Sequence, residues 1–183
     1  TLAWAADDEA AVTLFSLLGE RGLHDALSAL VSQRPDAEVA LAGLPADALG
    51  HWRDVLAKRQ ARELARLVAL PNWQDAVATL EGSAAQVPDD PLEIQRRAAL
   101  AAVRHSAAAV DERLAALACL DGITLTGGRQ AAWAGGKAEL DAVKDALKRL
   151  RALWRDHACA LGLRLNAQDE ELAEALPALR GAF

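Results

Sequence analysis

Residues 114–154 read LAALACLDGITLTGGRQAAWAGGKAELDAVKDALKRLRALW, and this stretch decides the expected fold. Apolar residues recur at spacings of three and four on both sides of a glycine-rich centre. They are Val103, Ala107, Val110, Leu114 and Leu117 before the centre, and Leu140, Val143, Leu147, Leu150 and Trp154 after it. Such spacing places each set on one face of an α-helix. We therefore predict two helices, over residues 92–120 and 137–161, that pack along these faces.

The centre of the stretch favours an ordered turn over a third helix. Asp121 and Gly122 end the first helical pattern, and a pair of glycines at 135–136 precedes the second. Between them, residues 123–126 alternate and include β-branched side chains, which favours an extended conformation. The sequence thus predicts a long antiparallel helical hairpin with a Gly-rich tip.

The composition predicts an all-α protein, a helical bundle built around this hairpin. Of the 183 residues 52% are hydrophobic but only 4% are aromatic, and alanine and leucine supply most of the apolar fraction. Alanine has the highest helix propensity of all residues. The length suits a single helical domain over residues 1–183. The alternative is a division at the loop of residues 81–91, into an N-terminal subregion 1–82 and a hairpin subregion 89–176.

The sequence contains no signal for a membrane or for secretion. No run approaches the roughly 18 apolar residues of a membrane span, and the first residues lack the basic start of a signal peptide. We expect no membrane contact and a cytoplasmic location. In an antiparallel hairpin Cys119 would face residue 138 and Cys159 would face residue 98. The Cα atoms of the two cysteines would then be farther apart than the roughly 7 Å that a disulfide allows. Both thiols are therefore expected to be reduced and partly buried.

No motif in the chain predicts catalysis. The P-loop pattern, the G-x-S-x-G elbow and the H-E-x-x-H zinc motif are all absent. His157 and Cys159 resemble a pair of metal ligands, but a zinc site needs a third and a fourth, so we expect no metal. The four histidines have no partner three or four residues away, which predicts packing or surface roles. We expect no catalytic residue and no cofactor in this chain.

Basic residues of the hairpin form the main candidate binding surface. Four of them are spaced 4, 3 and 4 along the second helix, and three tip residues extend the set. The set is Lys144, Lys148, Arg151 and Arg155, with Arg129, Trp133 and Lys137 at the tip. The cations could neutralise the phosphates of a polyanion, and the tryptophan could stack on a base. The alternative is that the cations flank the apolar face as solvated residues and the tryptophan anchors the loop.

A second basic row occurs on the long helix expected over residues 46–70. Lys58, Arg62 and Arg66 are spaced by four and share a face, either as solvated residues or as a weaker phosphate contact. Residues 51–155 contain 16 Lys and Arg against 13 Asp and Glu, for a charge of +3, whereas the remainder has 4 against 13, for −9. The net charge of −6 argues against a dedicated, tight nucleic-acid binder.

The sequence of residues 120–157 resembles the accessory 1B region of superfamily 1 DNA helicases of the UvrD/RecB/AddA type. The resemblance rests on the residues 127–129 with Trp133, and on the pattern of Val143, Lys144 and residues 147–151 in the following helix. Residues 14–35 resemble the helices that follow the first motor domain in those proteins. The absence of methionine fits a fragment of a longer reading frame.

This resemblance implies a non-catalytic accessory domain of an ATP-dependent DNA helicase or helicase–nuclease involved in DNA repair. Its partners would be the DNA backbone, bound weakly by the isolated chain, and the motor domains of the parent chain, with a nuclease subunit as a further candidate. ATP and Mg²⁺ would bind only in the motor domains. The alternative is a helical protein–protein interaction module without a nucleic-acid role, which would use the apolar face of residues 140–154 or the helix over 92–120.

Overall fold

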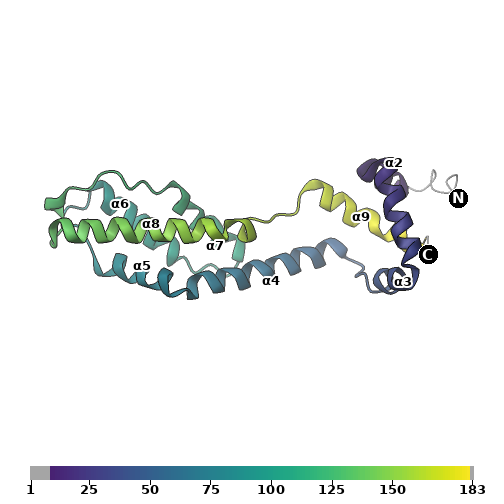
Figure 1. Cartoon of the computed structure of the whole chain (residues 1–183), viewed down its shortest axis with the longest axis horizontal. Helices are drawn as coiled ribbons and strands as arrows, with labels where there is room; N and C mark the ends of the chain where they lie inside the picture. The colour runs from purple at the N-terminus through teal and green to yellow at the C-terminus, as the bar shows by residue number, and fades with distance from the viewer. Residues whose placement is uncertain (1–8, 182–183) are drawn as a thin grey trace. The chain divides into compact units, whose positions relative to one another are not determined.

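The computed structural model describes residues 9–181 and shows an all-α protein (Figure 1). These residues form eight α-helices and two short 3-10 helices, and they contain no β-strand, only an isolated antiparallel bridge between Ala85 and Trp133. The elements are α2 Glu9–Ser32, α3 Arg34–Ala42, α4 Ala48–Ala69, α5 Pro71–Gly82, α6 Pro91–Val103, α7 Val110–Leu117, η1 Ala118–Gly122, η2 Gln130–Ala132, α8 Gly136–Leu161 and α9 Ala167–Gly181. Within the described ranges, no helix combines the length and the apolar character that crossing a bilayer requires.

The chain divides into two compact units. The terminal unit consists of Thr1–Leu56 and Arg164–Phe183, and the central unit of Ala57–Leu163. The boundary expected in the loop of residues 81–91 is therefore not where the structure divides, because that loop lies inside the central unit. There Ala85 pairs with Trp133, and α5 packs along α8, so both sides of the loop share one core.

The core of the central unit confirms the apolar face predicted on α8. Leucines from α4, α5, α6 and α7 belong to the same core as that face, and α5 is the most extensive partner of α8. The five predicted side chains of α8 are all buried: Leu140, Val143, Leu147, Leu150 and Trp154. Full burial of a leucine contributes about 1.5–3 kcal/mol, so this face supplies much of the stability of the unit. The same burial removes the 140–154 face as a docking surface for another protein.

The helix predicted over residues 92–120 is split in the structure. Helix α6 ends at Val103, residues 104–109 are not helical, and α7 begins at Val110. Val103, Ala107 and Val110 keep helical spacing across the break, so periodicity could not reveal it. Both pieces still bury their apolar faces, through Leu100 in α6 and through Leu114 in α7.

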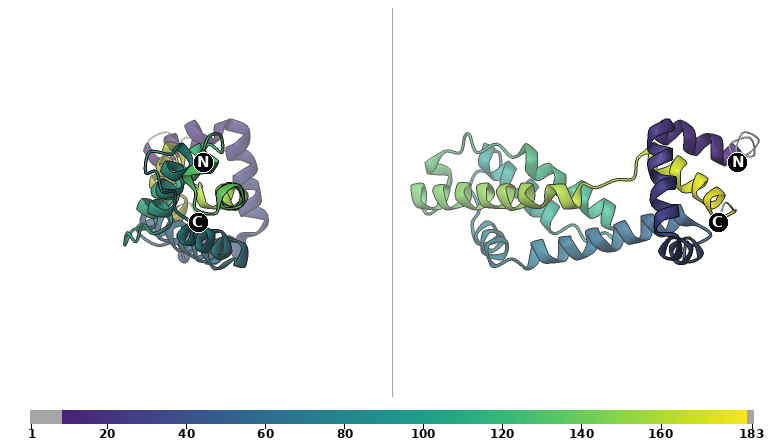
Figure 2. Two further views of the ribbon diagram at one scale, coloured as in Figure 1. Left: turned by 90° about the vertical axis from the view of Figure 1, so that its left-hand side faces the viewer. Right: turned by 45° about the vertical axis from the view of Figure 1, so that its right-hand side comes forward.

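A non-helical return segment, residues 123–129, runs beside α8 in the opposite direction (Figures 1 and 2). At one end the Ile123 carbonyl accepts a hydrogen bond from Arg151, late in α8. At the other end Gly128 lies against Leu140 and Leu92, near the starts of α8 and α6. Because both helices start at this end, α6 and α8 run in the same direction. The structure therefore does not confirm a hairpin of these two helices.

The antiparallel partners of α8 come earlier in the chain. The side chain of Gln60 in α4 is buried and donates to the carbonyl oxygens of Leu161 and Leu163, both at 2.9 Å. At the other end Ala85 pairs with Trp133, just before α8 begins. The run of α4 and α5 thus follows α8 from its end back to its start.

Buried charged groups fix the start of α6. Asp90 caps the helix, because its Oδ1 accepts from the backbone N–H groups of Leu92 and Glu93 at 3.0 and 3.4 Å. Glu93 in turn accepts from Arg96 through both carboxylate oxygens, each at 2.7 Å, and from the N–H of Ala85 at 3.1 Å. Burial raises the pKa of Glu93, but the bonds from Arg96 and Ala85 outweigh it and hold the pKa below its ordinary value.

The terminal unit has a small core and an exposed apolar surface. Helix α2 packs against α9, and Gly19 breaks the helical geometry of α2 with a φ of 67°. A reciprocal cap starts α9, with Asn166 N–H donating to Asp169 at 2.9 Å and Asp169 N–H to Asn166 at 3.1 Å. Several large apolar side chains are exposed: Val12, Phe15, Leu18, Leu27, Val31 and Val39.

Candidate functional site

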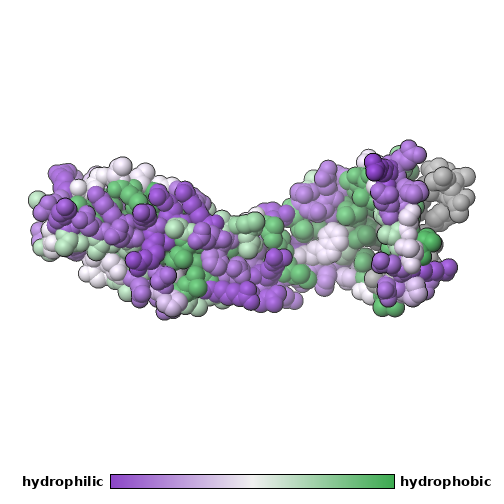
Figure 3. All heavy atoms as spheres, in the orientation of Figure 1, coloured by the Kyte–Doolittle hydropathy of each residue, from purple (hydrophilic) through white to green (hydrophobic). Residues whose placement is uncertain are grey.

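The candidate site is a stripe of cations along α8. Five of its basic residues are spaced 7, 4, 3 and 4, so a period of 3.6 residues brings them to one side of the helix. We call this set the α8 stripe: Lys137, Lys144, Lys148, Arg151 and Arg155. Gly135 precedes the helix and donates its N–H to the Glu139 carboxylate at 2.7 Å, which satisfies one free donor of the first turn. Figure 3 shows that the visible face of the central unit is mainly hydrophilic.

The two arginines of the stripe hold the return segment and η1. Arg151 Nη1 donates to the Ile123 carbonyl at 2.8 Å. Arg155 Nε donates to Asp121 Oδ1 at 2.9 Å, and Asp121 Oδ2 accepts from the Trp154 indole at 2.9 Å. The bonds from Arg155 and Trp154 hold the pKa of Asp121 below its ordinary value. Both guanidinium groups therefore have structural acceptors, and neither is fully available to a ligand.

The three lysines of the stripe differ from the arginines. Lys137 and Lys148 are exposed and Lys144 is half-buried. In the part of the chain that the structure describes, none of the three ammonium groups has a hydrogen-bond or ion-pair partner. Uncompensated cations on one helix face can each contact a phosphate without reading a base. The lysines are thus the part of the predicted site best suited to a polyanion.

The tip residues divide in the same way. Arg129 has an exposed side chain, while its backbone N–H donates to Asp90 Oδ2 at 2.8 Å. Gly128, its neighbour, lies against Leu140, which places Arg129 toward the end of α8 that carries Lys137. The predicted extension of the stripe by Arg129 is therefore compatible with the structure.

Trp133 is not exposed for stacking on a base. Its side chain is 3% exposed and belongs to the core, and its backbone pairs with Ala85. This corrects its prediction as a binding residue and favours the loop-anchoring alternative. Its Nε1 is buried and has no hydrogen-bond partner among the described residues.

The second basic row lies on the exposed face of α4. Lys58, Arg62 and Arg66 are all exposed, but Arg66 pairs with Glu63 at 3.3 Å and Arg62 Nε donates to the Lys58 carbonyl at 3.4 Å. Within this row, Lys58 is thus the residue whose charged group has no partner among residues 9–181. The row remains a weaker candidate than the α8 stripe.

His157 has a partner that its sequence neighbours do not reveal. Its Nδ1 lies 2.9 Å from Glu63 Oε1, so the pair links α8 to α4 across 94 residues. Among the described residues, no group of three or more His, Cys, Asp or Glu is arranged to hold a metal ion. Cys119 and Cys159 are free and exposed, which corrects their expected partial burial. The register expected for Cys119 is also wrong, because Asp121, two residues later, meets Arg155 rather than the start of α8.

Comparisons of this chain with protein-family models, with curated proteins and with solved structures give no match. The site must therefore be interpreted from its own geometry and charge.

Proposed function

We propose that this chain is a non-catalytic accessory domain that contacts the backbone of DNA through the lysines of the α8 stripe. The parent protein would be an ATP-dependent DNA helicase or helicase–nuclease of the cytoplasm, as the resemblance of residues 120–157 suggests. ATP and Mg²⁺ would bind only its motor domains. The observation that carries the proposal is the row of Lys137, Lys144 and Lys148, three cations on one helix face without partners among the described residues.

The distribution of charge supports weak and sequence-independent binding. The central unit, residues 57–163, has 15 Lys and Arg against 13 Asp and Glu, for a charge of +2. The terminal unit has 5 against 13, for a charge of −8. A domain that adds a few phosphate contacts to a larger machine does not need to be basic overall. DNA attracted to this chain should therefore reach the central unit and be repelled by the terminal unit.

The test is the salt dependence of DNA binding by the full chain. Replacing Lys137, Lys144 and Lys148 together with Gln should weaken binding to a labelled duplex and lower the slope of log affinity against log salt by about 2 to 3, since each duplex phosphate contact contributes about 0.9. Fluorescence anisotropy at low salt measures both quantities. Because the three side chains carry no structural bonds, the circular dichroism spectrum and melting temperature should not change.

The α4 row provides the matched control. Gln substitutions at Lys58, Arg62 and Arg66 remove the same number of charges from the same unit, and they should change the slope less. A larger loss of DNA affinity and salt slope in the α4 variant would mean that the DNA-binding site is on α4. Undetectable binding by the unmodified chain at low salt would contradict the proposal.

The sequence around this chain in its reading frame tests the proposed parent. A P-loop motif upstream and an acidic D-E-x-x motif downstream are expected for a helicase. A stop codon directly after residue 183 would contradict this parent.

A second candidate function, a protein–protein interaction module, is favoured by one observation. The terminal unit exposes large apolar side chains, including Phe15 at 50%, Val31 at 66% and Val39 at 75%, and it is strongly acidic. An apolar surface with basic surroundings on another protein would complement it. This candidate becomes the better one if the chain binds neither duplex nor single-stranded DNA.

A further inference from the structure

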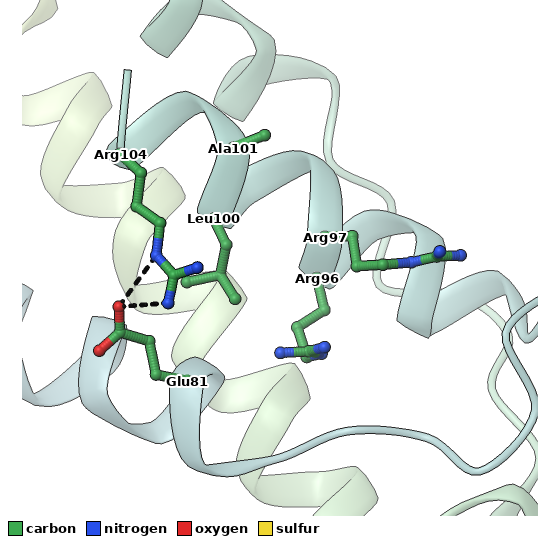
Figure 4. A pocket seen from close by; sticks show the side chains of 6 residues that line it. All are labelled: Glu81, Arg96, Arg97, Leu100, Ala101 and Arg104. Carbon is green, nitrogen blue, oxygen red and sulfur yellow. Dashed lines mark hydrogen bonds and ion pairs between the residues drawn. The ribbon is translucent and has the colours of Figure 1, made fainter. Parts of the chain in front are cut away.

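A hollow of about 390 Å³ lies in the central unit, between the end of α5 and α6 (Figure 4). Glu81 from α5 lines one side, and the other lining residues come from α6 and its C-terminal cap: Arg96, Arg97, Leu100, Ala101 and Arg104. Three arginines thus share one hollow with a single glutamate on its wall. The α8 stripe includes none of these residues.

Arg96 is a fixed part of this hollow. Its Nε and Nη2 donate to the two oxygens of Glu93, each at 2.7 Å, and its Nη1 donates to the Leu80 carbonyl at 2.5 Å. Both partners of the Arg96–Glu93 ion pair are buried, so their charges largely cancel. Arg96 therefore shapes the hollow and adds little net charge to it.

Arg97 and Arg104 are the exposed cations of the hollow, and Arg97 Nε lies 3.6 Å from Glu93 Oε1. They are seven residues apart, about 10.5 Å along the helix axis. In Figure 4 the Arg104 side chain turns toward Glu81, whereas the Arg97 side chain extends away from Arg104. Arg104 donates from Nε and Nη2 to one oxygen of Glu81, at 3.1 and 2.8 Å, in a pair whose side chains are 63% and 43% exposed. Arg97 Nη2 donates to the Pro88 carbonyl. An exposed ion pair contributes little stability, so Glu81 is readily exchanged for another anion.

The unused hydrogen-bond donors and the net charge of the hollow indicate which kind of ligand it can bind. Within the described part of the chain, Nη1 of Arg97 and Nη1 of Arg104 donate no hydrogen bond. The three arginines with Glu81 and Glu93 leave a net charge of +1. A phosphodiester carries one negative charge and matches this value, whereas a phosphate monoester carries close to two. Forked guanidinium donors bind the oxygens of such a group well.

We propose that this hollow binds one backbone phosphate of a DNA strand, with Arg104 as the donor. In the free protein Glu81 forms an ion pair with Arg104, and the phosphate displaces Glu81 when it binds. The proposal rests on the DNA-binding role proposed above and adds a contact on α6 that is separate from the α8 stripe.

The direction in which two single substitutions change DNA affinity tests this arrangement in the full chain. Arg104→Gln should weaken binding to a labelled duplex at low salt by about three- to tenfold and lower the salt slope by about 0.9. Glu81→Gln should strengthen binding, because it removes the competing acceptor of Arg104. If the Glu81–Arg104 pair were only structural, both substitutions would weaken binding together. Arg21→Gln is the matched control, because Arg21 is an exposed cation of the acidic terminal unit.

The outcomes separate this inference from the proposed function. If the α8 lysine variant loses DNA binding while Arg104→Gln behaves like Arg21→Gln, DNA contact by the α8 stripe is supported and the hollow is not a phosphate site. If Glu81→Gln weakens binding, the displacement by phosphate is wrong. If Arg104→Gln weakens binding and the α8 variant does not, the phosphate site in the hollow is supported and the DNA contact by the α8 stripe is contradicted. Melting temperatures of all variants identify any loss that comes from unfolding.

Discussion

The buried carboxylate of Asp90 accepts a hydrogen bond from the backbone N–H of Arg129 at 2.8 Å, across 39 residues of sequence. The other oxygen of the same carboxylate caps α6. One side chain thus fixes both the start of a helix and the end of the return segment. The cap follows from the sequence, because Asp before Pro91 is a common helix start, but the bond to Arg129 does not.

Asp90→Ala should lower the free energy of unfolding by about 2–4 kcal/mol, because it removes the cap and leaves buried N–H groups without an acceptor. Chemical denaturation monitored by circular dichroism measures the change. The neighbouring Asp89 is exposed, so Asp89→Ala is the control and should change stability by less than about 0.5 kcal/mol. Equal losses from the two variants would show that the capping network does not stabilise the fold.

Leu147→Ala should cost about 2–5 kcal/mol, since the Leu147 side chain is fully buried in the α8 core. Ile94 is 48% exposed on α6, and Ile94→Ala should cost much less. The shift of the urea midpoint compares the two variants. An unchanged midpoint for Leu147→Ala would mean that the buried face of α8 is assigned incorrectly.

Gly128→Ala should destabilise the central unit by more than about 1 kcal/mol, because residue 128 has a φ of 83° that side chains rarely adopt. A Cβ there would also lie 2.7 Å from Leu140 Cδ1 and 3.1 Å from Leu92 Cβ. At Gly122 a Cβ meets nothing within 4 Å, so Gly122→Ala is the matched variant. Thermal melts of both proteins test the difference, and similar melting temperatures would contradict it.

Arg155→Gln should leave the salt slope of DNA binding unchanged, because Arg155 donates to both the carboxylate and the backbone carbonyl of Asp121, and Trp154 holds the same carboxylate in place. Its exposed ion pair should contribute only about 0–1 kcal/mol to stability. Lys148→Gln should instead lower the slope by about 0.9 without a change in stability. A loss of slope in the Arg155 variant would show that the pair opens to receive DNA.

The Glu63–His157 pair predicts a loss of stability in acid. The hydrogen bond from His157, aided by Arg66, holds the pKa of Glu63 below its ordinary value of 4.5. Because this pKa is lower in the folded than in the unfolded chain, the stabilisation is complete above pH 4.5 and is lost as the pH falls through the folded pKa. His157→Gln should therefore make stability less dependent on pH in that window. Urea midpoints from about pH 6 to about pH 3 measure this, and parallel curves for the two proteins would contradict it.

Local rules predicted α8 and its buried face, while the path of the chain between the helices was not predictable. The face of α8 and the Asn166 cap depend on residues within a few positions, where spacing and capping preferences act. The break after Val103 was hidden by an apolar pattern that continues through it.

The candidate site shows the same limit. Helical spacing alone placed the lysines of α8 on one face. The acceptors of Arg151 and Arg155, at Ile123 and Asp121, lie on segments whose path depends on tertiary packing. The Glu63–His157 contact spans 94 residues, and no local pattern reports such a pair.

The return segment has a consequence for the order in which the central unit folds. Its N–H groups at Thr124 and Arg129 donate to side chains of α6 and its cap, Gln95 and Asp90, and its first carbonyl accepts from α8. The complete set of bonds can form only when both helices are in place, because two bonds need α6 and its cap and the third needs α8. The segment makes no helix of its own. The return segment should therefore become ordered last, after α6 and α8 have packed together. Its amide protons should accordingly exchange with solvent through local opening, well before those of the α8 core.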